Sequence, residues 1–273
     1  MNISKKWLLV IIIPLAIVLI IVGIYYSWKL KKENEIKDSF AKTLNMYPIK
    51  NLEDLYDKEG YRDEEFDKDD KGEWILQSSM ATQGKNEDLI SEGMLLKVNR
   101  NKKETKGYYF INRYKNNPDS YEDDESEKTY PVELKNNKIH LSEKVDNKNL
   151  ERKIKKFKLF SQYGNFKNLS KLKNGNIEIN PEVPNYSLQY HLTNRNSNVK
   201  KLRDTYDIPT NKAPKLILKG SGDLSGESGD VKTIEFEFIR NQKETVKFSD
   251  SISYQPTYCL LYTSDAADEE DSV

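Results

Sequence analysis

The longest hydrophobic segment of the chain lies near its N-terminus, at residues 7–28, and reads WLLVIIIPLAIVLIIVGIYYSW without a charged side chain. A helix rises about 1.5 Å per residue, so this segment spans roughly the 30 Å hydrocarbon core of a bilayer. Trp7 and Trp28 stand at its two ends, where aromatic rings favour the membrane interface. Pro14 is tolerated inside such a helix. The pattern predicts a membrane anchor that includes Trp7, Pro14 and Trp28.

Two other interpretations of this segment are weaker. A cleaved signal peptide has an apolar region of about 7 to 15 residues before small side chains, whereas this longer run ends in Tyr25-Tyr26-Ser27-Trp28. A buried core helix would need a matching apolar segment to cover it, and the rest of the chain is polar. An uncleaved single-pass helix is therefore the favoured interpretation.

The orientation of this anchor is nearly balanced by charge. Lys5 and Lys6 precede the segment, and a comparable lysine cluster at residues 29–32 follows it. A short tail at residues 1–6 and a large folded mass behind the helix favour a cytoplasmic N-terminus and an extracellular domain at residues 29–258. We expect protease added to intact cells to digest that domain.

Periodicity beyond the anchor predicts a β-rich domain. Apolar residues recur at helical spacing over 30–47, before Pro48, and a short capped helix is expected from Asn51 to Gly60. Seven to nine strands, mostly joined by hairpins, favour one antiparallel α+β or mainly-β domain. Ile234, Phe236 and Phe238 alternate onto one face of the strand at 231–240, and Asn136-Asn137 favours a hairpin turn between 130–134 and 138–141. The strands are expected at 74–80, 94–99, 107–114, 130–134, 138–141, 186–192, 215–219, 231–240 and 245–250, with a further short helix at 199–206.

The segment at residues 147–162 has the pattern of an amphipathic helix. Leu150, Ile154, Phe157 and Phe160 fall on one stripe, with lysines on the opposite side. The favoured interpretation is a solvated basic face over a packed apolar face. A helix that contacts a membrane or an anion is the alternative.

Composition becomes informative once the last residues are set apart. Residues 259–273 read CLLYTSDAADEEDSV, which breaks with the preceding Lys/Asn/Tyr-rich style and resembles a translated sequencing-library adaptor; we expect this tail not to be native. The whole chain has 44 basic and 44 acidic residues, and leaving out the five acidic residues of the tail gives a net charge of +5. This charge is spread among acidic runs, which does not favour nucleic-acid binding.

The chain offers little recognisable chemistry. Cys259, the only cysteine, lies in that tail, so no disulfide is predicted and lipidation has no acceptor near the anchor. Asp67 to Gly72 starts like a calcium loop, but Lys71 replaces a ligand and the closing glutamate is missing, so we expect a polar turn. His140 and His191 lack companions at metal-ligand spacing. No catalytic, cofactor or metal site is predicted.

Several motifs give the chain a family resemblance. They are FAKTLNMYPIKNLEDLYDKEGYRDEEF at 40–66, GYYF at 107–110, YPV at 130–132, QYGNF at 162–166, NPEVP at 180–184 and YDIPTNKAPKL at 206–216. With these residues the chain resembles the staphylococcal tandem lipoproteins, or Csa family, from about Ser39 to Tyr254. The resemblance implies a surface-exposed envelope protein without known enzyme activity, associated with host-cell contact and entry. It also implies a curved antiparallel sheet like the half-barrels of lipoprotein carriers.

One departure and one alternative function follow from this resemblance. Typical members are lipidated on a lipobox cysteine, which this chain lacks near its anchor, so the uncleaved helix would replace the lipid. The leading hypothesis is a membrane-anchored interaction module with a host surface partner. The alternative is a carrier or sensor of an apolar ligand in the envelope, because a curved sheet can enclose a cavity. Trp74, Tyr109, Phe236 and Phe238 are the candidate lining residues of that cavity.

Overall fold

A computed structural model describes most of the chain. The described residues are 5–62, 66–84, 87–115, 125–180, 182, 185–206, 208–222, 224, 232–241 and 244–257. The tail that we expect not to be native, at residues 259–273, lies outside this set. The side chains of residues 5–11 also lie outside it, which includes Trp7.

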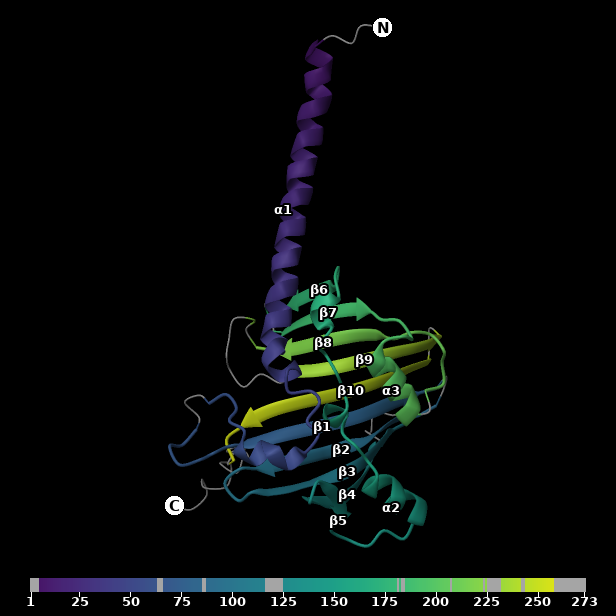
Figure 1. Ribbon diagram of the computed structural model, residues 1–273. Helices are drawn as coiled ribbons and strands as arrows, with labels where there is room; N and C mark the ends of the chain where they lie inside the picture. Colours follow the sequence, from purple (N-terminus) through teal and green to yellow (C-terminus); the bar gives the residue numbers. More distant parts are fainter. Residues whose placement is uncertain are drawn as a thin grey trace, which may run out of the picture.

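The domain is built on one antiparallel sheet, which contains ten strands within the described residues and is not closed into a barrel (Figure 1). The strand order is β5-β4-β3-β2-β1-β10-β9-β8-β7-β6. The chain thus builds one half outward from β1 to β5, crosses to the far edge, and returns from β6 to β10, where β10 pairs with β1. The strands are β1 Glu73–Gln83, β2 Leu89–Asn99, β3 Glu104–Tyr114, β4 Glu125–Lys135, β5 Lys138–Leu141, β6 Asn176–Asn180, β7 Asn185–His191, β8 Lys215–Ser221, β9 Lys232–Asn241 and β10 Glu244–Gln255.

The helices pack against one face of this sheet (Figure 1). Strand β9 shows why: Ile234, Phe236 and Phe238 alternate toward the helices and are buried, as the sequence predicted. The opposite face carries cross-strand ion pairs such as Lys219 with Glu235, 2.8 Å apart. The helices are α1 Lys5–Leu44, α2 Lys148–Lys155 and α3 Ser197–Thr205, with short 3-10 turns η1 Leu52–Asp57, η2 Phe160–Gln162 and η3 Leu169–Lys171.

The structure confirms the single open antiparallel sheet and corrects two of its elements. Strand β6 was not predicted, because NIEIN is short and polar and lies at an edge, where Ile179 remains 41% exposed. The single helix predicted over 147–162 is wrong, since α2 ends at Lys155. The chain leaves the helical path because Phe160 packs into the core, with its ring 5.4 Å from that of Phe236.

Helix α1 joins the apolar segment to the domain without a break. Pro14 lies inside it, and the large apolar side chains from Ile12 to Trp28 are exposed. This is the one helix in the described part of the chain that is long and apolar enough to cross a membrane. The exposure contradicts a buried core helix. The C-terminal part of the same helix buries Ile36 and Phe40 against the sheet.

Candidate functional site

A buried polar network fixes α1 to the domain just after the apolar segment. The Glu33 carboxylate, 2% exposed, accepts hydrogen bonds from the Tyr190 hydroxyl at 2.7 Å and the Lys37 ammonium at 2.9 Å. Lys37 also donates to the carbonyl of Leu172 at 2.7 Å. These contacts connect α1 to β7 and to the loop before β6, so they fix the C-terminal part of α1 to the domain.

Charge complementarity stabilises this network. Burial alone would raise the pKa of Glu33, but hydrogen bonds from Tyr190 and Lys37 outweigh it and keep this pKa below its ordinary value. Glu33 is therefore ionised at neutral pH and is paired with a cation on its own helix. A buried pair of this kind tolerates the loss of one partner poorly, because the other charge is left uncompensated.

A second buried group lies at the centre of the sheet. Asp250 on β10 is 1% exposed and accepts hydrogen bonds from the Tyr47 hydroxyl, at 2.5 Å, and from the Ser78 hydroxyl. Ser78 in turn accepts from the backbone N–H of Phe160 at 2.9 Å. One carboxyl group thus links β10, β1, the segment after α1 and the η2 turn.

Burial determines the protonation of this carboxyl group. It raises the pKa of Asp250 to about 7, although hydrogen bonds from Ser78, Tyr47 and the Ser161 backbone oppose the shift. No cation forms an ion pair with Asp250 among the described residues. Asp250 therefore titrates near neutral pH while sealed in the core, where no solvent-borne substrate can reach it.

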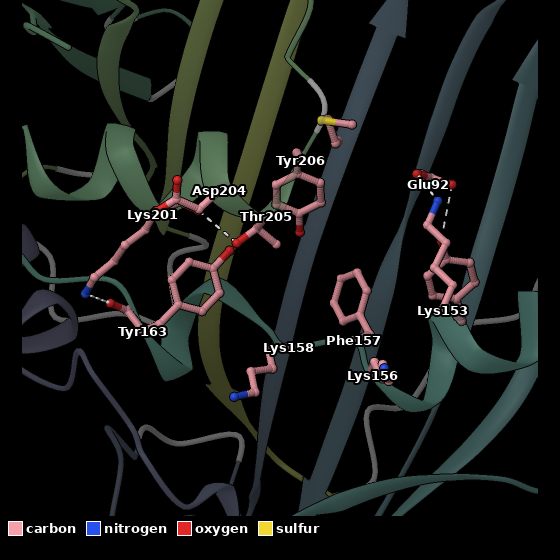
Figure 2. A pocket seen from close by; sticks show the side chains of 12 residues that line it. Glu92, Lys153, Lys156, Phe157, Lys158, Tyr163, Lys201, Asp204, Thr205 and Tyr206 are labelled. Atoms are coloured by element: carbon pink, nitrogen blue, oxygen red, sulfur yellow. Dashed lines mark hydrogen bonds and ion pairs between the residues drawn. The ribbon is translucent and has the colours of Figure 1, made fainter. Parts of the chain in front are cut away.

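A cavity of about 650 Å³ lies beside this core, between α2, α3 and strands β1 to β3 (Figure 2). Its floor is formed by buried residues of the sheet, Met80 on β1 and Tyr109 on β3. Its mouth is formed by exposed side chains such as Lys156 and Lys158, which follow α2. The volume is in the range of small-molecule sites in proteins, roughly 300–1,000 Å³.

Aromatic rings make up the apolar wall of the cavity. Figure 2 shows Phe157, Tyr163 and Tyr206 converging on it from separate segments. Burial raises the pKa values of Tyr109, Tyr163 and Tyr206, so all three phenols remain protonated and can donate hydrogen bonds. The buried Tyr163 hydroxyl makes no well-aligned hydrogen bond within the described residues, although Thr205 and Tyr206 are its neighbours.

The charged side chains of the cavity are mostly basic. Four lysines and two acidic residues line it. Lys153 pairs with Glu92 at 2.5 Å, and Lys201 donates to the carbonyl of Tyr163 at 2.6 Å. Neither Lys156 nor Lys158 has an ion pair with any described residue, so the mouth carries a local excess of positive charge.

The structure sorts the residues that the sequence singled out. Of the four proposed lining residues only Tyr109 lines this cavity. Phe236 belongs to the packed core and borders a smaller cavity of about 340 Å³ near α3, while Trp74 and Phe238 are buried in the core, which corrects that expectation. The expected reason for a cavity, a curved sheet lined by its own rings, is also incomplete. Residues outside the sheet supply most of the wall, because α2 and α3 stand off β1 to β3.

The calcium-like segment is a polar turn, as predicted. Asp70 accepts hydrogen bonds from the backbone N–H of Gly72 and of Thr257, both at 2.8 Å. Burial opposes ionisation of Asp70, but hydrogen bonds from Thr257 and Gly72 outweigh it and lower its pKa to about 2. Both histidines lie on strands, as expected. Within the described ranges, no three His, Cys, Asp or Glu side chains are grouped so that they could hold a metal ion.

Sequence reasoning missed the residues that define the cavity and the buried acid. Tyr163 and Tyr206 stand in two of the family motifs, QYGNF and YDIPTNKAPKL, but nothing in those motifs separates a tyrosine that packs from one that borders a cavity. Asp250 is one acid in a strand of alternating residues. The basic stripe after α2 was the one available signal. Its lysines are typical of a solvated face, with contact to a membrane or an anion as the alternative.

Comparisons with known proteins agree on one family. The family model described as the Csa1 family matches residues 32–257. An uncharacterized lipoprotein of Staphylococcus aureus strain USA300 is 53% identical over 247 residues, which are 90% of this chain and 96% of that protein. An uncharacterized lipoprotein of strain MSSA476 is 57% identical over 224 residues, covering 82% of this chain and 88% of the relative.

Proposed function

The chain belongs to the Csa1 family, and from this premise we propose that it is a membrane-anchored, non-enzymatic interaction module of the cell surface. The supporting observation is the continuity of α1, whose exposed apolar part leads directly into a part that is buried against the sheet. Such a helix needs lipid around its first half and the domain around its second. The relatives are named lipoproteins, which supports attachment of this chain to a membrane as well.

In this proposal the helix itself is the anchor. No cysteine near residues 7–28 can accept a lipid, and the Glu33 network joins the helix to the domain. The mature protein should therefore fractionate with membranes and retain its N-terminal segment. Intact-protein mass spectrometry of the membrane fraction tests this. A mature form that begins after Trp28 and is found in the medium would contradict it.

The domain is proposed to face outward, with a cytoplasmic N-terminus. Protease added to intact cells should remove residues beyond the anchor, while a cytoplasmic protein in the same cells stays whole. Lysis before protease provides the positive control. Complete protection of the domain in intact cells would overturn the orientation.

The partner proposed for this module is a protein on a host-cell surface. This follows the expectation drawn from the family resemblance, and an outward-facing domain could make such a contact. The test is saturable binding of the full-length protein, in lipid nanodiscs, to cultured host cells. Empty nanodiscs and nanodiscs with an unrelated single-pass protein of similar net charge are the controls. Binding no greater than that of these controls would contradict the proposal.

A second candidate function, carrying or sensing an apolar ligand, is favoured by the cavity. Its aromatic wall and buried floor offer an apolar site of about 650 Å³ that the helices leave unfilled. A ligand retained through gentle extraction should appear in native mass spectra of the protein. A spectrum of the protein alone, after extraction in a detergent too bulky for the cavity, would count against a carrier.

A further inference from the structure

The geometry points to a specific ligand class for this cavity: a single-chain amphiphile with an anionic head group, taken from the aqueous phase. The inference rests on the second candidate function, that the cavity holds an apolar ligand. It adds the sign of the head group, its position and the side from which the ligand enters.

The apolar part of such a molecule matches the inner half of the cavity. Phe157, Tyr163 and Tyr206 converge there (Figure 2). The buried residues Met80 and Tyr109 line the same cavity. The flexible thioether of Met80 and the ring faces suit a chain of methylene groups, which needs contact area but no fixed polar partners. Water would find few hydrogen-bond partners in this apolar half of the cavity.

The anionic head group matches the mouth. Lys153 and Lys201 are already engaged, with Glu92 and with the Tyr163 carbonyl, at 2.5 and 2.6 Å. Lys156 and Lys158 carry the charges that no described residue neutralises. Asp204, in α3, forms no ion pair with a described lysine, so the head group is expected to lie away from it, toward Lys156 and Lys158. A carboxylate or phosphate there would form charge-assisted hydrogen bonds.

The Tyr163 hydroxyl lies in the inner half of the cavity and is shielded from solvent. Its neighbours are the hydroxyl groups of Thr205 and Tyr206, whose hydrogen bonding opposes the rise in its pKa that burial causes. Because this hydroxyl has polar neighbours within the protein, the assignment of an anionic head group rests on the lysines at the mouth.

The position of the cavity identifies the source of the ligand. Helix α1 docks beside β6 and β7, whereas the cavity lies over β1 to β3, on the other side of β8 to β10 in the sheet order. Figure 1 shows α2 at the end of the domain away from the apolar part of α1. Lipids of the bilayer that holds the anchor are therefore remote from the mouth, and the ligand is expected to arrive through water.

The test uses the full-length protein in phosphatidylcholine nanodiscs and a laurate analogue with a diazirine at its chain end. After illumination, peptide mapping should place label on segments 156–163 and 201–206, separate from label on the apolar part of α1. Laurate and dodecyl phosphate should compete for the cavity label roughly tenfold better than dodecanol, the ratio expected from charge-assisted hydrogen bonds. Comparing the two anions shows whether the site prefers a carboxylate or a phosphate.

Variants separate charge from folding. Lys156→Gln with Lys158→Gln should abolish the advantage of laurate over dodecanol. Lys155→Gln is the matched control, because Lys155 pairs with Glu151 at 2.6 Å and does not line the cavity. Equal competition by dodecanol and laurate would overturn the anionic assignment and leave an apolar carrier. Absence of cavity label would overturn both, and leaves the surface-interaction proposal untouched.

Discussion

Two aromatic clusters lie on the same face of the sheet, and one is filled whereas the other is hollow. In the first, Phe160 packs edge-on against Phe236 and Phe248, with ring centroids 5.4 and 5.3 Å apart. In the second, Phe157 and Tyr163 border the cavity. Each cluster takes a ring from the same stretch of chain after α2, Phe160 in the first and Phe157 in the second, so aromatic content alone does not decide which cluster closes.

The difference lies in what covers each cluster. The η2 turn packs the ring of Phe160 against the face of the sheet. The buried hydrogen bonds of Ser78 and Asp250 fix that turn. Beside it, α2 and α3 approach the sheet without filling the space between them. The filled cluster is therefore expected to provide stability and the hollow one to provide binding.

The largest expected effect separates two phenylalanines three residues apart. Phe160→Ala should lower the free energy of unfolding by about 3–5 kcal/mol, because the ring is fully buried and its loss leaves a cavity. Phe157→Ala should cost only about 1–2 kcal/mol, since this half-buried ring already borders empty space. Urea unfolding of both variants measures the contrast. Equal losses would show that the hollow cluster stabilises the fold as much as the filled one does.

The next effect concerns pH and Asp250, which lies in the filled region. Its pKa is about 7 in the folded protein and near the ordinary 3.8 when unfolded, so the folded state holds this proton more tightly. Its contribution to stability is complete below about pH 4 and is lost as pH rises to about 7, a change of a few kcal/mol. Asp250→Asn should remove this dependence.

Unfolding free energies of both proteins from pH 4 to 8 provide the measurement. The difference between them isolates Asp250 from groups such as Asp70 and Glu33, whose lowered pKa values make stability fall at lower pH. Parallel pH profiles for the two proteins would show that Asp250 titrates at its ordinary value.

The smallest effect compares two buried tyrosine hydroxyls. Tyr47→Phe removes a donor to Asp250 and should cost about 1–3 kcal/mol near pH 8, where that carboxylate is ionised. Tyr163→Phe removes a hydroxyl without a well-aligned partner and should change stability by less than about 0.5 kcal/mol. Thermal and urea unfolding distinguish them. A large loss for Tyr163→Phe would mean that the hydrogen bonding of this hydroxyl with Thr205 and Tyr206 stabilises the fold.

The sequence predicted correctly those features that depend on neighbouring residues alone, such as strand alternation, turns and helix caps. Alternation along Val231 to Arg240 identified β9 and its buried face, and Asn136-Asn137 identified the β4–β5 hairpin, where both residues adopt positive φ angles of 53° and 56°. Asn51 caps η1 as expected, accepting a hydrogen bond from the N–H of Glu53 at 3.2 Å. The helix over 147–162 failed because the pull of the core on Phe160 is not encoded in its own periodicity.

The sequence alone determined the long apolar helix, the antiparallel character of the domain and its family, because each depends on side-chain order along the chain. Only the tertiary structure decided which aromatic residues close a core and which border a cavity. The walls of that cavity come from α2, α3 and β1 to β3, segments far apart in sequence. Their separation is set by how each packs on the sheet, and the burial of Asp250 is set in the same way by non-local packing.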